Sequence, residues 1–433
     1  MRMTTSFTGS RGVRYPAPDV ARGLMLLLIA VANVPSWNRM PDNFLGTRPA
    51  STADTWWVFV RVLLVDHRAY PLFAMLFGFG LMTMINRRIA SVTQACLRSL
   101  PGVDAGREPT PQEEAWAREQ ATLDARRLVR RRGWWMILFG FVHGIIFSGD
   151  IIGAYGLVAV ILAGWLARKR YTHLYAVGAI IMLVATGSFL AMGFASPEST
   201  AVWSGQQQSP ALTGLPWFVI NIEVWTIALF AQVLIVLIVP AAVIGARLAD
   251  TDLITQPDRH RRLLVLVGIG GLVIGALGAL HSALTGVLPI SEWPWDAAAK
   301  ELFGIVGACG WLALLALYAG GPPPDGRLTG VRRLASAVGR RSMTVYLSQT
   351  ILFGTIFVLI PILATGERLW VGQAAAALIA LAVWAVTVVL CAVLERGGHA
   401  GPFETLLRTA VARSERKRPV TAPPAQPVTQ PGA

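Results

Sequence analysis

Long apolar segments recur along the whole chain, and they constrain its fold more than any other feature. A membrane-spanning helix needs roughly 20 mostly apolar residues, because each residue advances the helix by about 1.5 Å. The sequence predicts about ten such segments, so the expected fold class is all-α, a polytopic transmembrane helical bundle. The segments lie at 20–36, 71–86, 133–149, 151–167, 171–194, 217–245, 263–288, 299–319, 342–362 and 369–395.

The composition favours lipid over water as the surrounding of most of the chain. Charged residues make up 14% and hydrophobic residues 54%, whereas about a quarter of an ordinary soluble protein is charged. These charges are too few to cover a water-facing surface. One further segment, 54–66, places tryptophan and aliphatic residues around Arg61, which is typical of an amphipathic helix lying at the membrane surface.

The positions of the basic residues predict the orientation. If the first span starts in the cytoplasm, 32 of the 38 Lys and Arg residues fall in cytoplasmic segments. Cytoplasmic loops of membrane proteins are enriched in Lys and Arg, so both termini are predicted to be cytoplasmic. The same alternation argues against a nucleic-acid partner, because no single domain concentrates the net charge of +14.

The chain is predicted to have three regions. Residues 1–18 form a cytoplasmic N-terminal segment, 19–408 the membrane domain, and 409–433 a cytoplasmic tail whose Pro, Thr and Gln content favours disorder. The longest cytoplasmic loop, 87–132, joins a Pro/Gly stretch to a charged helical stretch. The three cysteines lack CxxC spacing, which indicates unpaired thiols.

Ionisable side chains next to or inside apolar segments are candidates for function, because a charge in lipid is costly. The first group is Asp19-x-x-Arg22-Gly23, at the inner mouth of the first span. Residues three apart on a helix share a face and can pair. Asn33 follows near the outer end of the same helix. A helix N-cap at Asp19 and an arginine that snorkels to the interface explain the pair equally well.

A second group combines a histidine with a carboxylate. His143 is predicted inside an apolar helix, and Asp150 caps the tight turn that follows it. Their spacing of seven residues places them near one helical face, about two turns apart. A neutral histidine there could act as a general base oriented by the carboxylate. A histidine bonded to a neighbouring helix, with an aspartate as turn cap, is an equally good interpretation.

Further polar groups stand at the inner mouths of two spans. Arg131 and Arg132 precede the span at 133–149, and Arg340 precedes the span that carries Gln349. Guanidinium groups at this level could grip phosphate, although positive-inside anchoring explains the arginines equally well. Anchoring does not explain Gln349. No P-loop, GxSxG, HExxH or CxxC pattern occurs, so the sequence predicts no metal site and no permanently bound cofactor.

Taken together, these motifs resemble the YeiB family of bacterial inner-membrane proteins, whose function is unassigned. The family motifs are D-x-x-R-G followed by Asn, LFS-x-LFG-x-G, G-x-x-H…GDIL…Y, GR-x-x-LTNYLxQS and GPxEWLLR. They match, in order, Asp19 to Gly23 with Asn33, Leu72 to Gly80, Gly140 to Tyr155, Gly339 to Thr350, and Gly401 to Arg408. Departures from the motifs are Ala74 for serine, Val345 for asparagine and Thr405 for tryptophan.

The family is also distantly similar to membrane acyltransferases, including the heparan-α-glucosaminide acetyltransferase group. That group shares the D-x-x-R-G opening and the Asn at the end of the first helix. The resemblance implies transfer of an acyl group from a cytoplasmic acyl-CoA co-substrate to a small-molecule, lipid or glycan acceptor. It also implies a multi-pass protein of the bacterial plasma membrane, with the lipid bilayer as its constant partner.

This resemblance suggests a role for each candidate residue. His143, with Asp150, would deprotonate the acceptor, and Asn33 would hydrogen-bond the developing oxyanion. Arginines at the inner face would hold the donor phosphates. The expected substrate- or cofactor-binding residues are Asp19, Arg22, Arg131, Arg132, Arg340 and Gln349.

Two other classes of function stay open at this stage. In a small-molecule transporter, His143, Asp150 and Glu223 could relay protons, with helices broken near Pro240 around a site. In a non-catalytic scaffold or sensor, the loop 87–132 would be the partner surface. The sequence does not indicate the oligomeric state.

Overall fold

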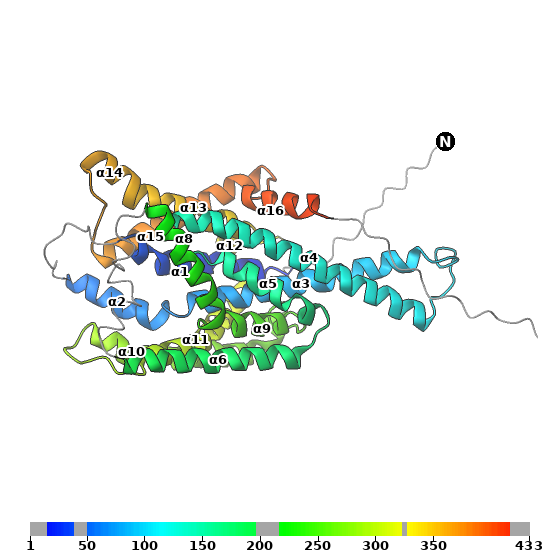
Figure 1. The fold of residues 1–433 in the computed structure, drawn as a ribbon, viewed down its shortest axis with the longest axis horizontal. Helices are drawn as coiled ribbons and strands as arrows, with labels where there is room; N and C mark the ends of the chain where they lie inside the picture. Colours follow the sequence, from blue (N-terminus) through cyan, green and yellow to red (C-terminus); the bar gives the residue numbers. More distant parts are fainter. Residues whose placement is uncertain (1–14, 39–49, 196–215, 323–326, 416–433) are drawn as a thin grey trace, which may run out of the picture.

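The fold is all-α, as the sequence predicts. The computed structural model describes residues 15–38, 50–195, 216–322 and 327–415, and no strand is present in these ranges. The helices are α1 (Ala17–Trp37), α2 (Thr52–Leu64), α3 (Ala69–Arg98), α4 (Pro111–Ile146), α5 (Ile152–Ala167), α6 (Tyr171–Phe194), α8 (Trp217–Leu234), α9 (Ile238–Leu248), η2 (Pro257–His260), α10 (Arg261–Thr285), α11 (Asp296–Ala319), α12 (Gly330–Gly339), α13 (Ser342–Gly354), η3 (Thr355–Leu359), α14 (Ile360–Thr365), α15 (Gln373–Arg396) and α16 (Pro402–Arg413). Most of them run along one long axis of the molecule (Figure 1).

The polytopic membrane class is confirmed by the length and composition of these helices. In the described part of the chain, seven helices are long and apolar enough to cross a membrane, or eight if the bent pair α8–α9 is one span. The other two predicted spans coincide with α5, which has 16 residues, and with the apolar half of α4, which directly follows three arginines. Ten spans therefore stay a prediction.

The first and last described helices meet at the same end of the bundle. The start of α1 packs against the end of α12, because Gly339 lies against the Asp19 carbonyl. Glu404 of α16 accepts hydrogen bonds from the start of α13. This arrangement fits two termini on one side of the membrane, and the cytoplasmic identity of that side stays a prediction. The predicted segment 1–18 and tail 409–433 lie largely outside the described residues, although α16 itself continues to Arg413.

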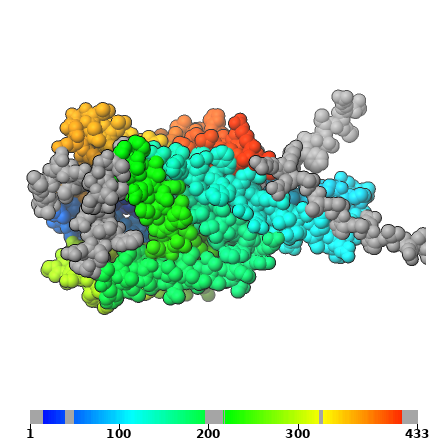
Figure 2. Space-filling view, in the orientation of Figure 1, coloured from blue at the N-terminus to red at the C-terminus, as the bar shows by residue number. Residues whose placement is uncertain are grey.

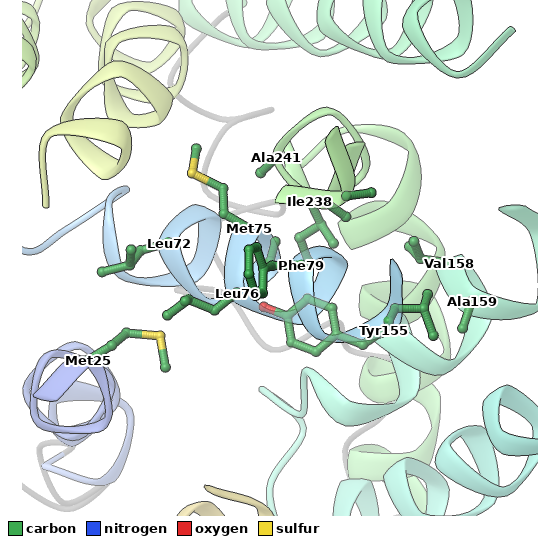
Figure 3. Close-up of a cluster of buried hydrophobic side chains, with 14 of the residues drawn as sticks. Met25, Leu72, Met75, Leu76, Phe79, Tyr155, Val158, Ala159, Ile238 and Ala241 are labelled. Carbon is green, nitrogen blue, oxygen red and sulfur yellow. The ribbon is translucent and has the colours of Figure 1, made fainter. Parts of the chain in front are cut away.

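Helices α1 and α3 form the centre of the bundle. Leu72, Met75, Leu76 and Phe79 of α3 are buried in one cluster with Met25 of α1. Figure 3 shows this cluster, with the Tyr155 side chain pointing from α5 toward α3. The Tyr155 ring packs on two further α3 residues, with ring centroids 5.0 Å from those of both Phe73 and Phe77. This packing fixes α5 against the central helix.

Two glycines bring α3 and α9 into backbone contact. A Cβ atom at Gly78 would lie 1.9 Å from the carbonyl oxygen of Ala242, and one at Gly245 would lie 1.8 Å from that of Met75. Small residues at helix contacts allow close approach, which is the main way in which membrane helices gain packing energy. Gly78 of α3 and Gly245 of α9 therefore allow the backbones of the two helices to approach each other closely.

Helices α8 and α9 form a broken pair with a bend of 54° between them. The break falls just before Pro240, which lacks a backbone N–H and cannot continue the hydrogen-bond ladder of a preceding helix. The freed N–H of Leu237 donates to the buried Glu301 carboxylate of α11, at 3.3 Å. A backbone donor that would otherwise be unsatisfied in the interior is thus paired.

The long loop 87–132 is a helical hairpin formed by the C-terminal part of α3 and the N-terminal part of α4. It projects beyond the rest of the bundle (Figure 2). Thr110 and Glu113 form a capping box at the start of α4. Arg107 donates to both carboxylate oxygens of Glu113, at 2.8 and 2.9 Å. These bonds, with those from Thr110, lower the pKa of Glu113 to about 2.

A helix is present where the amphipathic segment 54–66 was predicted, and its position at the membrane surface stays a prediction. It is α2, which has no buried residue and starts with a capping box between Ser51 and Asp54. Arg61 pairs with Asp66 at 3.1 Å. The three cysteines are free thiols, as their spacing indicates.

Candidate functional site

The two residues of the predicted acid–base pair are in direct contact. His143 Nδ1 lies 2.7 Å from Asp150 Oδ1, and the other ring nitrogen, Nε2, lies 2.9 Å from the Thr350 hydroxyl on α13. All three side chains are buried, with residue exposures of 5%, 1% and 4%. The result is a continuous chain of hydroxyl, imidazole and carboxylate between α4, the α4–α5 turn and α13.

The Asp150 carboxylate is held by donors on every side. It accepts from the backbone N–H groups of Ile152, at 3.1 Å, and Gly153, at 2.8 Å. The Trp225 indole N–H of α8 donates to the same carboxylate at 3.3 Å. The turn brings α4 and α5 so close that a Cβ at Gly140 would lie 2.5 Å from Asp150 Oδ2. The GD turn motif therefore both caps α5 and aims a carboxylate at His143.

This geometry assigns the proton on the imidazole. An ionised carboxylate only accepts hydrogen bonds, so Nδ1 of a neutral His143 carries the proton and donates a hydrogen bond to Asp150. The Nε2 lone pair then accepts from the Thr350 hydroxyl. A base oriented by a carboxylate and facing a hydroxyl is the arrangement used to activate oxygen nucleophiles.

Apolar rings surround the imidazole and separate it from water. Tyr346 meets the His143 ring edge-on, with ring centroids 5.3 Å apart. Phe147 lies on another side at 5.8 Å and is itself stacked on Trp37 of α1. Electrostatic interactions are stronger in such a water-poor environment than in solvent. The site is therefore suited to proton transfer in a dry interior.

Two other predicted residues lie outside this hydrogen-bond chain. Asn33 is partly exposed on α1, and its side chain makes no hydrogen bond to any residue that the structure describes. Gln349 is 2% exposed and donates to the Leu26 carbonyl of α1 at 3.2 Å. Its side-chain oxygen is buried without a partner. Gln349 thus has one acceptor available, next to the residue that contacts His143.

The arginines at the opposite end of α1 form a second group. Arg22 pairs with Asp19 at 3.5 Å and donates to the Leu76 carbonyl of α3 at 3.0 Å. Arg132 of α4 makes no hydrogen bond or ion pair within the described ranges. Burial, together with the like charges of Arg22 and Arg408, lowers the pKa of Arg132. Arg22 and Arg408 therefore lie near Arg132 at this end of the bundle, together with the Glu404 carboxylate.

Arg131 and Arg340 are engaged elsewhere. Arg131 pairs with Glu415 at 3.3 Å, and Arg340 pairs with Glu395 of α15. Of the arginines predicted to hold phosphate, the structure brings Arg22 and Arg132 together. Arg408, which the sequence analysis did not single out as a ligand, joins them from the GPxEWLLR-like motif.

A second histidine–carboxylate pair lies outside the predicted site. His67 Nδ1 is 2.8 Å from Glu301 Oε2, and Glu301 is 2% exposed. The Tyr70 hydroxyl lies beside this carboxylate and is buried without a hydrogen bond of normal geometry. The adjacent Arg68 is fully buried and donates to three backbone carbonyls.

Sequence reasoning missed several of these contributors for one reason. Thr350, Trp225 and Glu301 reach their partners from helices that are distant along the chain, so no local spacing indicates them. Thr350 lies at the end of a recognised motif, which was the only available signal. Glu223, in contrast, was considered from the sequence as part of a proton relay. It is exposed on α8, so it does not serve the buried proton relay for which it was considered.

A buried acid–base chain inside a bundle of membrane-length helices defines a polytopic membrane protein with a dry internal site. Residues 248–414 match the family model described as "Protein of unknown function (DUF418)". The chain is 26% identical over 428 residues to the "Uncharacterized protein YeiB" of Escherichia coli (strain K12), covering 92% of this chain and 96% of that protein. It is 24% identical over 434 residues to the "Uncharacterized protein YxaH" of Bacillus subtilis (strain 168), covering 90% and 92%.

These matches confirm the resemblance to a YeiB-like family of membrane proteins of unknown function. Both named relatives come from bacteria. The more distant similarity to acyltransferases and the location in the plasma membrane stay predictions.

Proposed function

We propose that this protein is a membrane acyltransferase that moves an acyl group from a cytoplasmic acyl-CoA donor to an acceptor hydroxyl or amine. One observation carries the proposal, the buried chain from the Thr350 hydroxyl through His143 to Asp150. An imidazole that donates to a carboxylate keeps its other nitrogen free to accept a proton. That is the requirement for a general base in acyl transfer.

The proposed reaction conserves atoms and charge. The acceptor O–H or N–H group replaces the Thr350 hydroxyl at His143 Nε2 and gives its proton to that nitrogen. The acceptor oxygen or nitrogen then attacks the thioester carbonyl carbon. The carbon–sulfur bond breaks, and the coenzyme A thiolate leaves and takes the proton back from the imidazolium. Asp150 stays ionised and stabilises the imidazolium in between.

The arginine group fits the other end of the donor. Arg132 and His143 are eleven residues apart on α4, which is about 16 Å along the helix axis. Arg22, Arg132 and Arg408 would hold the donor phosphates, because guanidinium groups match phosphate geometry. An extended pantetheine arm would then carry the thioester into the bundle. Asn33 is kept as a candidate oxyanion donor because its side chain has no partner among the described residues.

Binding and chemistry are tested separately in the purified full-length protein. We expect acyl-CoA to raise the unfolding temperature by mass action, and Arg132→Gln to remove that shift. The exposed Arg333 makes no ion pair within the described residues, so Arg333→Gln serves as the matched control and should keep the shift.

His143→Gln should keep the acyl-CoA shift and lose transfer of a radiolabelled acyl group to membrane-derived acceptors. Thr350→Val should keep transfer, if the hydroxyl only occupies the acceptor position in the resting state. Acyl transfer by His143→Gln at the wild-type rate would refute the proposal.

Transport is the second candidate, and the bent α8–α9 pair favours it. Discontinuous helices in transporters place backbone groups at a substrate site, and here the break is capped by Glu301, which also binds His67. In proteoliposomes, a transporter would move substrate without forming a covalent product, and Glu301→Gln would stop that flux. Transfer of label to an acceptor, insensitive to Glu301→Gln, would favour the acyltransferase.

A further inference from the structure

Two hollows flank the cytoplasm-proximal part of α4 around Arg130. One has a volume of about 530 Å³ and is lined by Arg127, Arg130, Arg131, Trp134, Trp135, Leu138 and Ser414. The other has a volume of about 400 Å³ and is lined by Arg126, Arg130, Val160, Ile161, Gly164 and Trp165. Arg130 lines both of them. Each hollow combines guanidinium groups with aromatic and aliphatic side chains.

Three of the four arginines that line these hollows have no partner among the described residues. Within the described ranges, Arg126, Arg127 and Arg130 make no ion pair or hydrogen bond. Arg131 uses one terminal nitrogen to bind Glu415, while its Nε is buried without a partner. The Trp135 indole N–H donates to Ser414 at 3.0 Å and ties α16 to α4 beside the larger hollow.

The lining changes from charged to apolar over two helical turns. Arg127 and Arg130 precede the apolar half of α4, and Trp134 and Leu138 follow, with exposures of 56% and 48%. Tryptophan is enriched at the level of lipid headgroups, and Lys and Arg are enriched on the cytoplasmic side of the membrane. The hollow therefore offers positive charge at headgroup depth and an apolar wall where an acyl chain would lie.

The larger hollow and the proposed catalytic site lie on different faces of α4. Met136, Gly140 and His143 form the buried face of α4, whereas Trp134 and Leu138 point outward from the bundle. A ligand in the larger hollow would thus contact the bilayer and not the imidazole. Charge and position together select a membrane lipid over a soluble phosphate compound.

We propose that the hollows around Arg130 bind an anionic phospholipid of the inner leaflet, with its phosphate on Arg127, Arg130 and Arg131 and an acyl chain along Trp134 and Leu138. Basic pockets between membrane helices on the cytoplasmic side recognise such headgroups. The site does not depend on the proposed acyltransferase activity.

The test compares phosphatidylglycerol with phosphatidylcholine of identical acyl chains, bound to the full-length protein and counted by native mass spectrometry. The test variant is Arg127→Gln with Arg130→Gln. The control is Arg98→Gln with Arg118→Gln, which removes the same charge from exposed positions on the projecting hairpin. Arg118 lies about 18 Å from Arg130 along α4. A third protein, Arg127→Lys with Arg130→Lys, keeps the charge.

We expect the wild type to prefer phosphatidylglycerol and the test variant to bind it roughly 30-fold more weakly. The control and the lysine protein should stay within about threefold of wild type. An unchanged unfolding temperature in phosphatidylcholine will show that the test variant is folded. Equal losses in the test and control variants, or equal binding of both lipids by wild type, would overturn the proposal. Displacement of the lipid by acyl-CoA would overturn it as well, by assigning the hollow to the donor.

Discussion

Replacing Asp150 by Asn probes the central hydrogen-bond chain with the smallest change of shape. The carboxylate accepts four bonds. One oxygen serves His143 and the Ile152 N–H, and the other serves the Gly153 N–H and the Trp225 indole. An Asn side chain keeps one acceptor oxygen and presents an NH2 donor in place of the other. In either orientation, two donors that contacted a carboxylate oxygen now face the NH2 group, which is itself a donor.

The two orientations differ in cost, and the cheaper one sets the magnitude. An NH2 group toward Gly153 and Trp225 leaves two buried donors unsatisfied, at roughly 1–3 kcal/mol each. An NH2 group toward His143 lets the imidazole change tautomer and donate from Nε2 to Thr350. Only the Ile152 N–H then stays unsatisfied. We expect Asp150→Asn to lower the free energy of unfolding by roughly 1–3 kcal/mol.

The same tautomer change predicts a much larger effect on activity. With the proton on Nε2, His143 cannot accept one from an acceptor, and a misoriented base of this kind costs about 10⁴-fold in rate. The assay is unfolding of the purified protein in detergent micelles, together with acyl transfer at saturating donor. Asp252→Asn is the matched control, because Asp252 also binds a histidine, His260, at 2.8 Å, but at the surface. A surface pair of this kind contributes less than about 1 kcal/mol.

Two outcomes would refute the reasoning. If Asp150→Asn destabilised the protein no more than the Asp252 control, the carboxylate would not be the buried acceptor that the geometry describes. If it were destabilised as expected but transferred acyl groups within tenfold of wild type, the orientation of His143 would not matter for catalysis.

Three further predictions concern a helix–helix contact and the starts of two helices. Gly78→Ala places a methyl group on the Ala242 carbonyl and should cost 1–3 kcal/mol or more in thermal or denaturant unfolding; Gly187→Ala, which meets nothing within 4 Å, should be tolerated. The start of α4, which includes Glu113, should keep its stability above a pH of about 4.3, the pKa of a Glu in an unfolded chain. It should lose stability as the pH falls toward the folded-state pKa of Glu113, which is about 2. Hydrogen exchange at 107–115 should show this loss in wild type and not in Glu113→Gln. Ser51→Ala removes the cap of α2 and should cost roughly 0.5–2 kcal/mol of local stability, seen as faster exchange in α2 alone; unchanged exchange would contradict the capping role.

The sequence by itself determined the class of the protein and the local pair His143–Asp150. Membrane helices must satisfy their backbone hydrogen bonds internally, so length and hydropathy suffice to predict them. The spacing of seven residues predicts that His143 and Asp150 lie near one helical face. The structure shows that they are in direct contact, at 2.7 Å, because α4 ends at Ile146 and Asp150 lies in the turn that follows. The resemblance to a YeiB-like family rested on similar short motifs.

Only the tertiary structure decided which distant residues complete the site. Thr350 reaches His143 from 207 positions away in the chain, and Trp225 reaches Asp150 from 75 positions away. It also decided that Arg340 shares the Glu395 carboxylate with Arg341, whereas Arg132 has Arg22, Arg408 and Glu404 as charged neighbours. The physical reason is that periodicity within one helix fixes only which face a side chain is on. The neighbour on that face depends on how helices pack, and in lipid that packing depends on small residues, such as Gly78 and Gly245, whose partners no single-sequence pattern indicates.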